Sequence, residues 1–261
     1  YEVGGKSLLG EGGTLKPNFW RAVTDNDMGA QLQKRFAVWR NPEMKLKSIQ
    51  ADKKSKMIIV AYDMPQVKAV LNIAYQIADN GTLTVNQNLK TKAGADVPEM
   101  LRFGMVMNLP YQMDKSQWFG RGPVENYCDR KYSQNVGIYS STADEMFFPY
   151  VRPQETGTMG DIRWWNQSDN NGAGLRVEAD KLFSASALHY NISDLDEGEE
   201  KDQRHSPSVP KSKFTNLCID LKQAGVGGVD SWGEDGRARK GYRVEYQDYD
   251  FTFSISPKSL Y

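Results

Sequence analysis

Two acidic residues set among aromatic and glycine residues could carry out acid–base chemistry. Glycoside hydrolysis, for example, needs one carboxyl group as acid and base and a second as nucleophile or base, on either side of the bond that breaks. Glu125 and Glu155 are the candidates for such a pair. Buried ion pairs with Arg121, Arg130 or Arg152 explain these carboxylates at least as well, so both interpretations stay open here.

The segment 225–233 combines four glycines with one tryptophan. Its sequence, GVGGVDSWG, lacks the third correctly spaced glycine and the following helix of a nucleotide-binding loop. The glycines favour a loop with positive φ angles. Trp232 has no strand face to bury it, so its ring either stacks on the apolar face of a sugar or packs beneath the loop.

Three consecutive polar residues, Asp25, Asn26 and Asp27, could bind a hard cation, since such ions take carboxylate and amide oxygens. The calcium-loop pattern is incomplete, because Gly29 comes one residue early and no glutamate follows in register. We therefore favour a turn stabilised by side chain–backbone bonds. The acidic stretch 194–200 is interpreted as a solvated face.

The few histidines and cysteines argue against several kinds of site. His189 follows small and apolar residues on a predicted strand, which favours a hydrogen-bonded structural role, and His205 lies in a charged segment. No Ser/His/Asp set can be assembled. Cys128 and Cys218 are too few for a disulfide framework and too widely spaced for a zinc clip. We predict no catalytic residue and no metal ligand in this chain.

The composition is typical of a β-rich globular protein. The 261 residues include 33 basic and 33 acidic ones, so no net charge directs the chain to nucleic acid or an anionic membrane. Apolar runs such as 57–62 are far shorter than the roughly 20 residues of a transmembrane helix. The 13 Tyr, 10 Phe, 6 Trp and 23 Gly suit strands joined by tight turns, and aromatic rings also form sugar-binding surfaces. Tyr1 is preceded by no methionine or leader, so we expect a piece of a longer protein, from which no cellular location follows.

Strands must position most of these residues, because strict alternation of apolar and polar residues is the dominant pattern. It predicts more than ten short strands, among them 57–62, 101–107, 174–179, 182–190, 217–221, 242–246 and 249–255. Asp79-Asn80-Gly81 separates two further runs, 67–77 and 82–90, and predicts a hairpin.

Helical spacing is limited to one place. Met28, Leu32, Phe36 and Trp39 predict a short helix after the Asp25–Asp27 turn, and 193–204 is expected to form a surface turn or loop. No repeat, low-complexity tract or linker interrupts the chain. We predict one domain over residues 1–261, an antiparallel all-β fold of two sheets packed face to face.

Four segments together carry a resemblance to a known family. They are FWRAVTDNDMG at 19–29, WFGRGPVENYCDR at 118–130, PYVRPQETG at 149–157 and GVGGVDSWG at 225–233. In this order they resemble motifs of the C-terminal (small-chain) domain of bacterial β-galactosidases in glycoside hydrolase family 2. The resemblance covers nearly the whole chain.

The resemblance implies a large antiparallel β-sandwich of the galactose-mutarotase-like type, called a supersandwich. It also implies that the two catalytic glutamates and an active-site magnesium belong to a TIM-barrel domain, whose eightfold alternation of strand and helix is missing from this sequence. By motif match, Trp232 with Ser231 and Asp230 would contact substrate. A mobile loop near the pocket would include Asp27 and Gly29. The matching residues Glu125, Asn126, Asp129, Arg130 and Glu155 are assigned structural roles.

The function expected from the resemblance is that of a domain of a retaining β-galactosidase, acting on terminal β-D-galactosides together with the barrel and other domains of the parent chain, which could be a homo-oligomer. No cofactor is expected in this domain itself, and no nucleic acid or membrane is expected as a partner. Two alternatives remain: a free-standing carbohydrate-binding module, with Trp232 as its platform, and an aldose epimerase. The second is weaker, because that enzyme class uses paired histidines.

Overall fold

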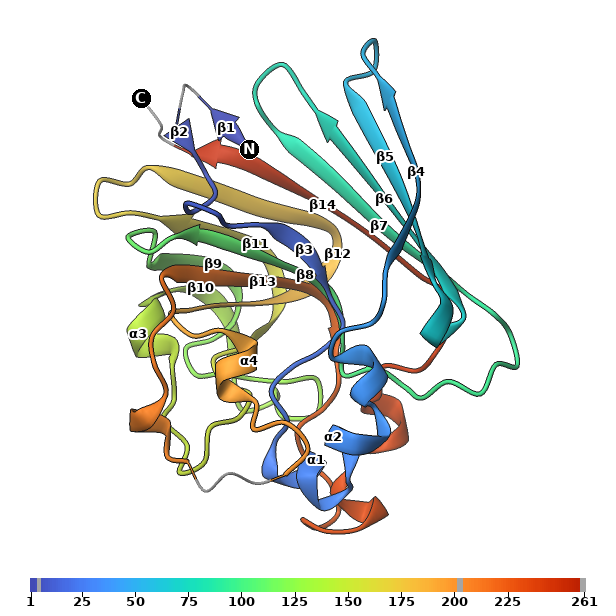
Figure 1. The fold of residues 1–261 in the computed structure, drawn as a ribbon. Helices are drawn as coiled ribbons and strands as arrows, with labels where there is room; N and C mark the ends of the chain where they lie inside the picture. Colours follow the sequence, from blue (N-terminus) through green and yellow to red (C-terminus); the bar gives the residue numbers. More distant parts are fainter. Residues whose placement is uncertain (4–5, 201–203, 259–261) are drawn as a thin grey trace.

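The computed structural model describes residues 1–3, 6–200 and 204–258. It is built mainly of antiparallel strands, with short helices at the lower end of the view in Figure 1. The strands are β1 (Glu2–Val3), β2 (Lys6–Ser7), β3 (Leu15–Asn18), β4 (Lys45–Asp52), β5 (Met57–Met64), β6 (Ala69–Ile77), β7 (Leu83–Thr91), β8 (Arg102–Pro110), β9 (Lys115–Gly122), β10 (Asn135–Thr142), β11 (Met159–Ser168), β12 (Gly174–Leu188), β13 (Phe214–Gln223) and β14 (Tyr249–Lys258).

Helical turns are short and lie between strands. The α-helical turns are α1 (Asp25–Gly29), α2 (Leu32–Arg35), α3 (Ala143–Met146) and α4 (Ile192–Leu195). The 3-10 turns are η1 (Ala37–Trp39), η2 (Pro65–Val67), η3 (Ser206–Ser208), η4 (Glu234–Gly236) and η5 (Lys240–Tyr242). None of the helices in the described ranges is long and apolar enough to cross a membrane.

Within the described residues, β1 and β2 form a small ribbon and the other twelve strands form one branched sheet. The branch lies at β12, whose first part, 174–179, pairs with β14 and whose last part, 184–188, pairs with β13. One arm continues through β14, β7, β6 and β5 to β4, and the other through β13 and β8 to β3. The all-β antiparallel fold class is therefore confirmed, but the two layers belong to one sheet and not to two separate sheets.

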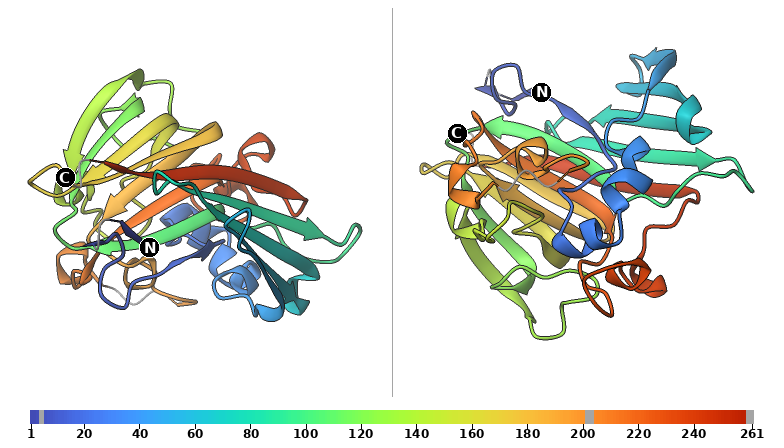
Figure 2. Two further views of the ribbon diagram at one scale, coloured as in Figure 1. Left: turned by 90° about the horizontal axis from the view of Figure 1, so that it is seen from above. Right: turned by 60° about the horizontal axis from the view of Figure 1, so that its bottom comes forward.

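The two arms curl over a single core, as the views in Figure 2 show. Phe103 of β8 stacks on Tyr249 of β14, with ring centroids 4.9 Å apart, so the arms are in direct contact. Trp118 of β9 and Trp165 of β11 stack at 5.3 Å in the same core. Burial of large side chains of this kind is the main stabilising term of a β fold, at about 25 cal/mol per Å² of apolar surface.

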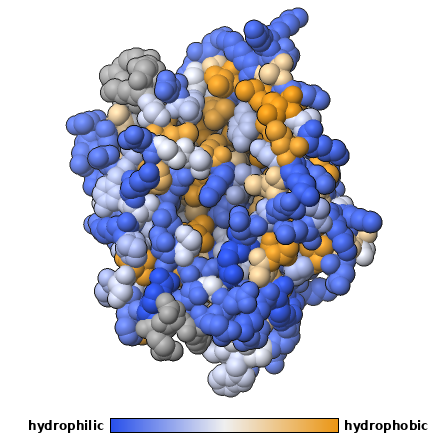
Figure 3. Space-filling model, in the orientation of Figure 1, coloured by the Kyte–Doolittle hydropathy of each residue, from blue (hydrophilic) through white to orange (hydrophobic). Residues whose placement is uncertain are grey.

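The far edge of the first arm is a wing with apolar side chains in solvent. Every residue of β4 is exposed, so this edge strand buries neither face. In Figure 3 the orange side chains gather in the upper part of the view, over the wing. The exposed large apolar residues of β4, β5 and β6 are Leu46, Ile49, Ile58, Ile59 and Ile77.

Two local predictions from the sequence are wrong. The run 242–246 alternates, but Tyr242 ends η5 and Val244 forms an isolated bridge with Met100. Its backbone meets separate partners, since the Tyr242 carbonyl oxygen accepts from the Gly225 N–H and the Val244 carbonyl oxygen from the Met100 N–H. Asp25–Asp27 are not a turn before a helix but the first turn of α1 itself, with Thr24 as its N-cap. The predicted helix through Trp39 is broken into α1, α2 and η1, and its apolar residues are buried as expected.

The hairpin prediction is confirmed, since β6 and β7 are joined by a turn in which Gly81 has a φ of 80°. The predicted runs 174–179 and 182–190 are one strand, β12. In the expected surface segment 193–204, α4 forms a helical turn, and residues 201–203 lie outside the described residues.

Candidate functional site

The four segments singled out in the sequence meet at one end of the molecule, the lower end in Figure 1, where α1 lies beside the segment that precedes β14. Arg21 donates from its guanidinium to the carbonyl oxygen of Gly225 at 3.0 Å. The Asp129 carboxylate accepts from the backbone N–H groups of Val226 at 3.2 Å and Gly227 at 2.9 Å. The first, second and fourth segments are thus joined by direct bonds.

The third segment is tied to the first at the same end. The Nε of Arg152 donates to Asp25 at 2.8 Å, and Gln154 donates to the other oxygen of Asp25 at 2.9 Å. These bonds fix the start of α1 against 149–157. All four segments therefore form one continuous structure, although up to 204 residues separate the bonded partners.

Gly29 explains how the tryptophan loop is seated on α1. A Cβ at this position would lie 2.0 Å from the carbonyl oxygen of Ser231, so only glycine allows the two backbones to approach. The Gly29 carbonyl oxygen also accepts from the Gly233 N–H at 3.0 Å. The sequence-predicted residues Gly29 and Ser231 are therefore in contact.

Asp230 orders the loop and Trp232 projects from it. The Asn26 side chain donates to the Asp230 carbonyl oxygen at 2.9 Å, and the Trp232 N–H donates to the Asp230 carboxylate at 3.0 Å. The Trp232 side chain is nevertheless in solvent, with 71% of the residue exposed. The backbone is held in place and the indole is left uncovered.

Asp27 lies beneath this surface. It is buried, 2% exposed, and forms an ion pair with Arg21 at 3.0 Å. Its carboxylate also accepts from the Thr24 N–H, while its own N–H donates to the Thr24 hydroxyl, which completes a capping box. Desolvation raises the pKa of Asp27, and Arg21 partly opposes that rise. Asp27 thus anchors the start of the helix and does not face solvent.

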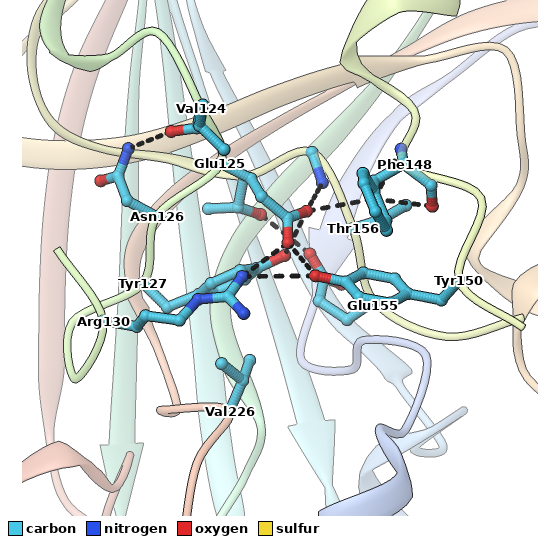
Figure 4. Close-up of polar contacts among 12 residues, drawn as sticks. Val124, Glu125, Asn126, Tyr127, Arg130, Phe148, Tyr150, Glu155, Thr156 and Val226 are labelled. Atoms are coloured by element: carbon cyan, nitrogen blue, oxygen red, sulfur yellow. Dashed lines mark hydrogen bonds and ion pairs between the residues drawn. The ribbon is translucent and has the colours of Figure 1, made fainter. Parts of the chain in front are cut away.

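Glu125 is enclosed by donors from two segments, 118–130 and 149–157 (Figure 4). One oxygen accepts from Arg130 at 2.6 Å and from the Tyr150 hydroxyl, and the other accepts from the Gly157 N–H at 2.7 Å and the Thr156 hydroxyl at 3.1 Å. A carboxylate with this many internal donors is fixed in orientation. This arrangement favours a structural role.

Glu155 belongs to a separate, deeper cluster. Both of its oxygens accept from Arg102, at 3.2 and 3.3 Å, and one also accepts from the Thr158 hydroxyl at 2.8 Å. Arg102 also faces Asp220, with a Nε–Oδ2 distance of 3.3 Å. Burial raises the pKa of Asp220 to about 7, because desolvation outweighs the attraction of Arg102 and the charge of Glu155 adds to the rise.

Sequence reasoning missed Arg102 and Asp220. Both stand at polar positions within apolar strands, which was the available signal, but neither neighbours a motif in the sequence. It also missed several exposed apolar side chains at the lower end. Apolar residues in irregular segments with no strand face to bury them would have indicated these positions: Val124, Phe148, Val151 and Val229.

Asn126 has a clear role in holding the second segment. Its side-chain oxygen accepts from the Gly160 N–H at 2.9 Å, and its Nδ2 donates to the Val124 carbonyl oxygen at 3.1 Å. The side chain is fully buried. It therefore replaces backbone partners in an irregular part of the chain.

The histidines are engaged elsewhere. His189 contacts Asp144 through Nδ1 at 3.0 Å and the Tyr111 carbonyl oxygen through Nε2 at 3.1 Å, and His205 contacts the Val151 carbonyl oxygen at 3.2 Å. Among the described residues, no group of three or more His, Cys, Asp or Glu is arranged to hold a metal ion. Among the exposed side chains at the lower end, Trp232 is the one that the sequence predicted to contact a ligand.

Comparison with known proteins identifies the family of this chain. The family described as "Beta galactosidase small chain" matches residues 1–255. A β-galactosidase of Priestia megaterium is 30% identical over 255 residues, covering 96% of this chain and 24% of that protein. A β-galactosidase of Lactobacillus delbrueckii subsp. bulgaricus is 33% identical over 223 residues, covering 83% of this chain and 21% of that protein. The chain thus spans about a quarter of the length of these curated relatives.

The solved structures that match this chain include an aldose epimerase homologue from C. elegans. It has a TM-score of 0.40 and 9% identity and covers 80% of this chain and 67% of its own. A GH36 α-galactosidase from Geobacillus stearothermophilus has a TM-score of 0.39 and 8% identity and covers 94% of this chain and 27% of its own. The family match over 255 residues carries the conclusion: the chain belongs to the β-galactosidase small-chain family.

Proposed function

We propose that this chain supplies a sugar-contacting surface to a retaining β-galactosidase, and that Trp232, Ser231 and Asp230 form this surface. The observation that carries the proposal is the 71% exposure of Trp232 on a loop whose backbone is fixed to Gly29 and Asn26. An exposed indole on a rigid support is suited to stacking on the apolar face of a pyranose, because little entropy is lost on binding.

The neighbours of the indole add polar groups suited to hydroxyls. The exposed Ser231 hydroxyl can both donate and accept a hydrogen bond, and the half-buried Asp230 carboxylate accepts from the Trp232 N–H. Trp232 would provide apolar contact area for the sugar ring, and the hydrogen bonds of Ser231 and Asp230 would fix the orientation of the sugar. Together they would position a galactoside, or the group to which galactose is linked, without taking part in bond cleavage.

Catalysis would come from outside these residues. Retaining hydrolysis uses two carboxyl groups about 5–5.5 Å apart across the glycosidic bond. Glu125 and Glu155 have their oxygens engaged by internal donors, which supports a structural role for both. We assign the catalytic glutamates and the magnesium to a TIM-barrel domain of the longer polypeptide, since the chain spans only about a quarter of its relatives.

The mobile part of the segment that starts at Gly29 would be α2, since Gly29 itself is in backbone contact with Ser231 and accepts a hydrogen bond from Gly233. Gln31, with a φ of 60°, separates α1 from α2 and provides a break at which α2 could turn. Asp27 would stay in place as the anchor, because it is bonded to Arg21 and Thr24.

Steady-state kinetics of the full-length enzyme with Trp232→Ala tests the proposal. We expect kcat/KM for a chromogenic β-galactoside to fall about tenfold, which corresponds to about 1.4 kcal/mol, mainly through a higher KM. Tyr132→Ala is the matched control, because Tyr132 is an equally exposed aromatic residue (80%) outside the loop. Unaltered kinetics for Trp232→Ala would contradict the proposal.

The chain alone separates the proposal from its alternatives. Purified residues 1–261 should not hydrolyse the galactoside, since the glutamates are assigned elsewhere. Turnover that persists after removal of host enzyme would refute that assignment. Saturable galactoside binding by the chain alone, combined with unaltered kinetics of the full-length Trp232→Ala enzyme, would instead favour a free-standing binding module.

A further inference from the structure

A cavity of about 630 Å³ lies against the face of β8 that points away from the core. Its floor is formed by β3, β8 and β13, and its walls by the segment after η1 and by α4. Figure 3 views the molecule from the side on which β3 and α4 lie. The volume is within the range of about 300–1,000 Å³ that is usual for small-molecule sites.

Side-chain amides dominate the polar lining of this cavity. Five asparagines contribute to it: Asn18, Asn41, Asn108, Asn191 and Asn216. An amide presents one acceptor and two donor hydrogens, and a ligand hydroxyl is likewise both donor and acceptor. A wall of amides is therefore matched to a ligand with many hydroxyl groups.

The charged groups of the cavity largely neutralise one another. The Asp196 carboxylate, with 4% of its side chain exposed, accepts from the Trp20 indole N–H at 2.7 Å and from Arg40 at 3.0 Å. The Arg40 guanidinium also lies over the Trp20 ring at 4.8 Å. This cluster is fixed by its internal bonds, so Lys16 at the rim is the remaining charge of the lining. The site is thus suited to a neutral ligand better than to an ion.

The amides on the floor are held in place and one of them has an unused donor. Asn108 donates to Asn216 at 2.7 Å, which sets the orientation of both. The Asn18 oxygen accepts from the Trp20 N–H at 3.3 Å, whereas its Nδ2 has no hydrogen-bond partner among the described residues, although Asn18 is 8% exposed. A buried donor without an acceptor is costly, and a ligand hydroxyl beside it would remove that cost.

We infer that this cavity binds a neutral, hydroxyl-rich molecule of the size of a mono- or disaccharide. The Asn18 amide N–H and the exposed Asn41 amide would bind hydroxyls, and Phe214 in the lining would contact the apolar ring or chain. No described residue of 225–236 lines the cavity, so this site is separate from the Trp232 loop. The inference holds whether or not the Trp232 loop contributes to galactoside cleavage.

Titration of the 15N-labelled protein tests the inference, with D-galactose and myo-inositol as neutral probes and D-galacturonate as the anionic one. We expect saturable shifts of the Trp20 indole signal, one of six such signals, and of the side-chain amides of Asn108 and Asn216. Galactose should bind at least as tightly as galacturonate. The absence of saturable shifts with either neutral probe, or tighter binding of galacturonate, would overturn the inference.

Variants at the rim locate the binding. Asn41→Trp places a large ring at an exposed lining position and should weaken galactose binding about tenfold or more. Met44→Trp at the same rim is the second variant, should the first fail to fold. Asn170→Trp, in an exposed turn, is the matched control and should bind like the wild type.

Wild-type affinity in a folded rim variant would show that the sugar binds elsewhere and would overturn the inference.

Discussion

The enclosed carboxylates and the Trp232 loop come from the same group of segments but use their polar groups in opposite ways. Glu125 and Glu155 direct every acceptor inward, to Arg130, Gly157, Arg102 and other donors of this chain. The Trp232 loop is fixed by backbone groups and by the Asp230 carboxylate, and it leaves the Ser231 and Trp232 side chains outside.

This difference separates two tasks within one set of motifs. The enclosed carboxylates hold distant segments together, at the expense of any acid–base chemistry of their own. The loop contributes little to that framework and presents a surface. Substitutions in the two regions should therefore differ strongly in their effect on stability, which the following predictions test from the largest effect to the smallest.

Arg102→Met should destabilise the fold by about 3–5 kcal/mol, because it leaves the buried carboxylates of Glu155 and Asp220 without a counter-charge. Urea unfolding at neutral pH measures this. The matched control is Arg176→Met, which breaks a more exposed pair with Glu178 and should cost less than about 1 kcal/mol. Equal losses of stability in the two variants would show that the buried ion pairs contribute no more to the fold than an exposed pair does.

Glu125→Gln should cost about 1.5–3 kcal/mol, because an amide replaces a charged acceptor and turns one acceptor into a donor facing Arg130 or Gly157. Thermal unfolding measures the loss, with Glu11→Gln at an exposed position as the control. A variant as stable as the control would mean that Glu125 is not part of the framework.

The stability of the protein should decrease as the pH rises from about 4 to 7 through the contribution of Asp220. Its pKa is raised from 3.8 to about 7 on folding, so in this window the folded state holds a proton that the unfolded state has lost. The slope from one such group is at most about 1.4 kcal/mol per pH unit.

Asp220→Asn should remove this part of the slope, and Asp180→Asn at an exposed position should not. Urea unfolding across the pH window decides the matter. An unchanged slope in Asp220→Asn would show that Asp220 is ionised throughout.

Trp232→Ala should change the free energy of unfolding of the chain by less than about 0.5 kcal/mol, since the ring is mostly in solvent. Trp165→Ala, at a fully buried tryptophan, should cost about 3–5 kcal/mol in the same melts. A large loss of stability in Trp232→Ala would place its ring in the framework and weaken the proposal that it awaits a ligand.

Several strands could be predicted from alternation in the sequence, and strands exposed on both sides could not. β7 and β14 bury alternate residues and were predicted, whereas β9 also buries alternate residues and was missed. β4 and most of β10 are exposed on both sides, so no alternation marks them. Alternation of apolar and polar residues indicates which side chains are buried, so it reveals a strand only where one face of that strand is buried.

The site was only partly predictable, for a different reason. The irregular backbone at 225–233 and the lack of a strand face for Trp232 could be read locally. The bonds that position the loop join residues far apart in sequence, such as Asp129 with Gly227 and Arg21 with Gly225. No local pattern specifies these pairs, and the Arg102–Asp220 pair is hidden in the same way.

The branch of the sheet at β12 also affects how the chain is made. β14 pairs with both β7 and the first part of β12, and it is synthesised after every other strand described here. Until residues 249–258 leave the ribosome, both partners keep an open edge, which is a template for pairing with other chains. Pairing of β14 with both strands closes these two edges together.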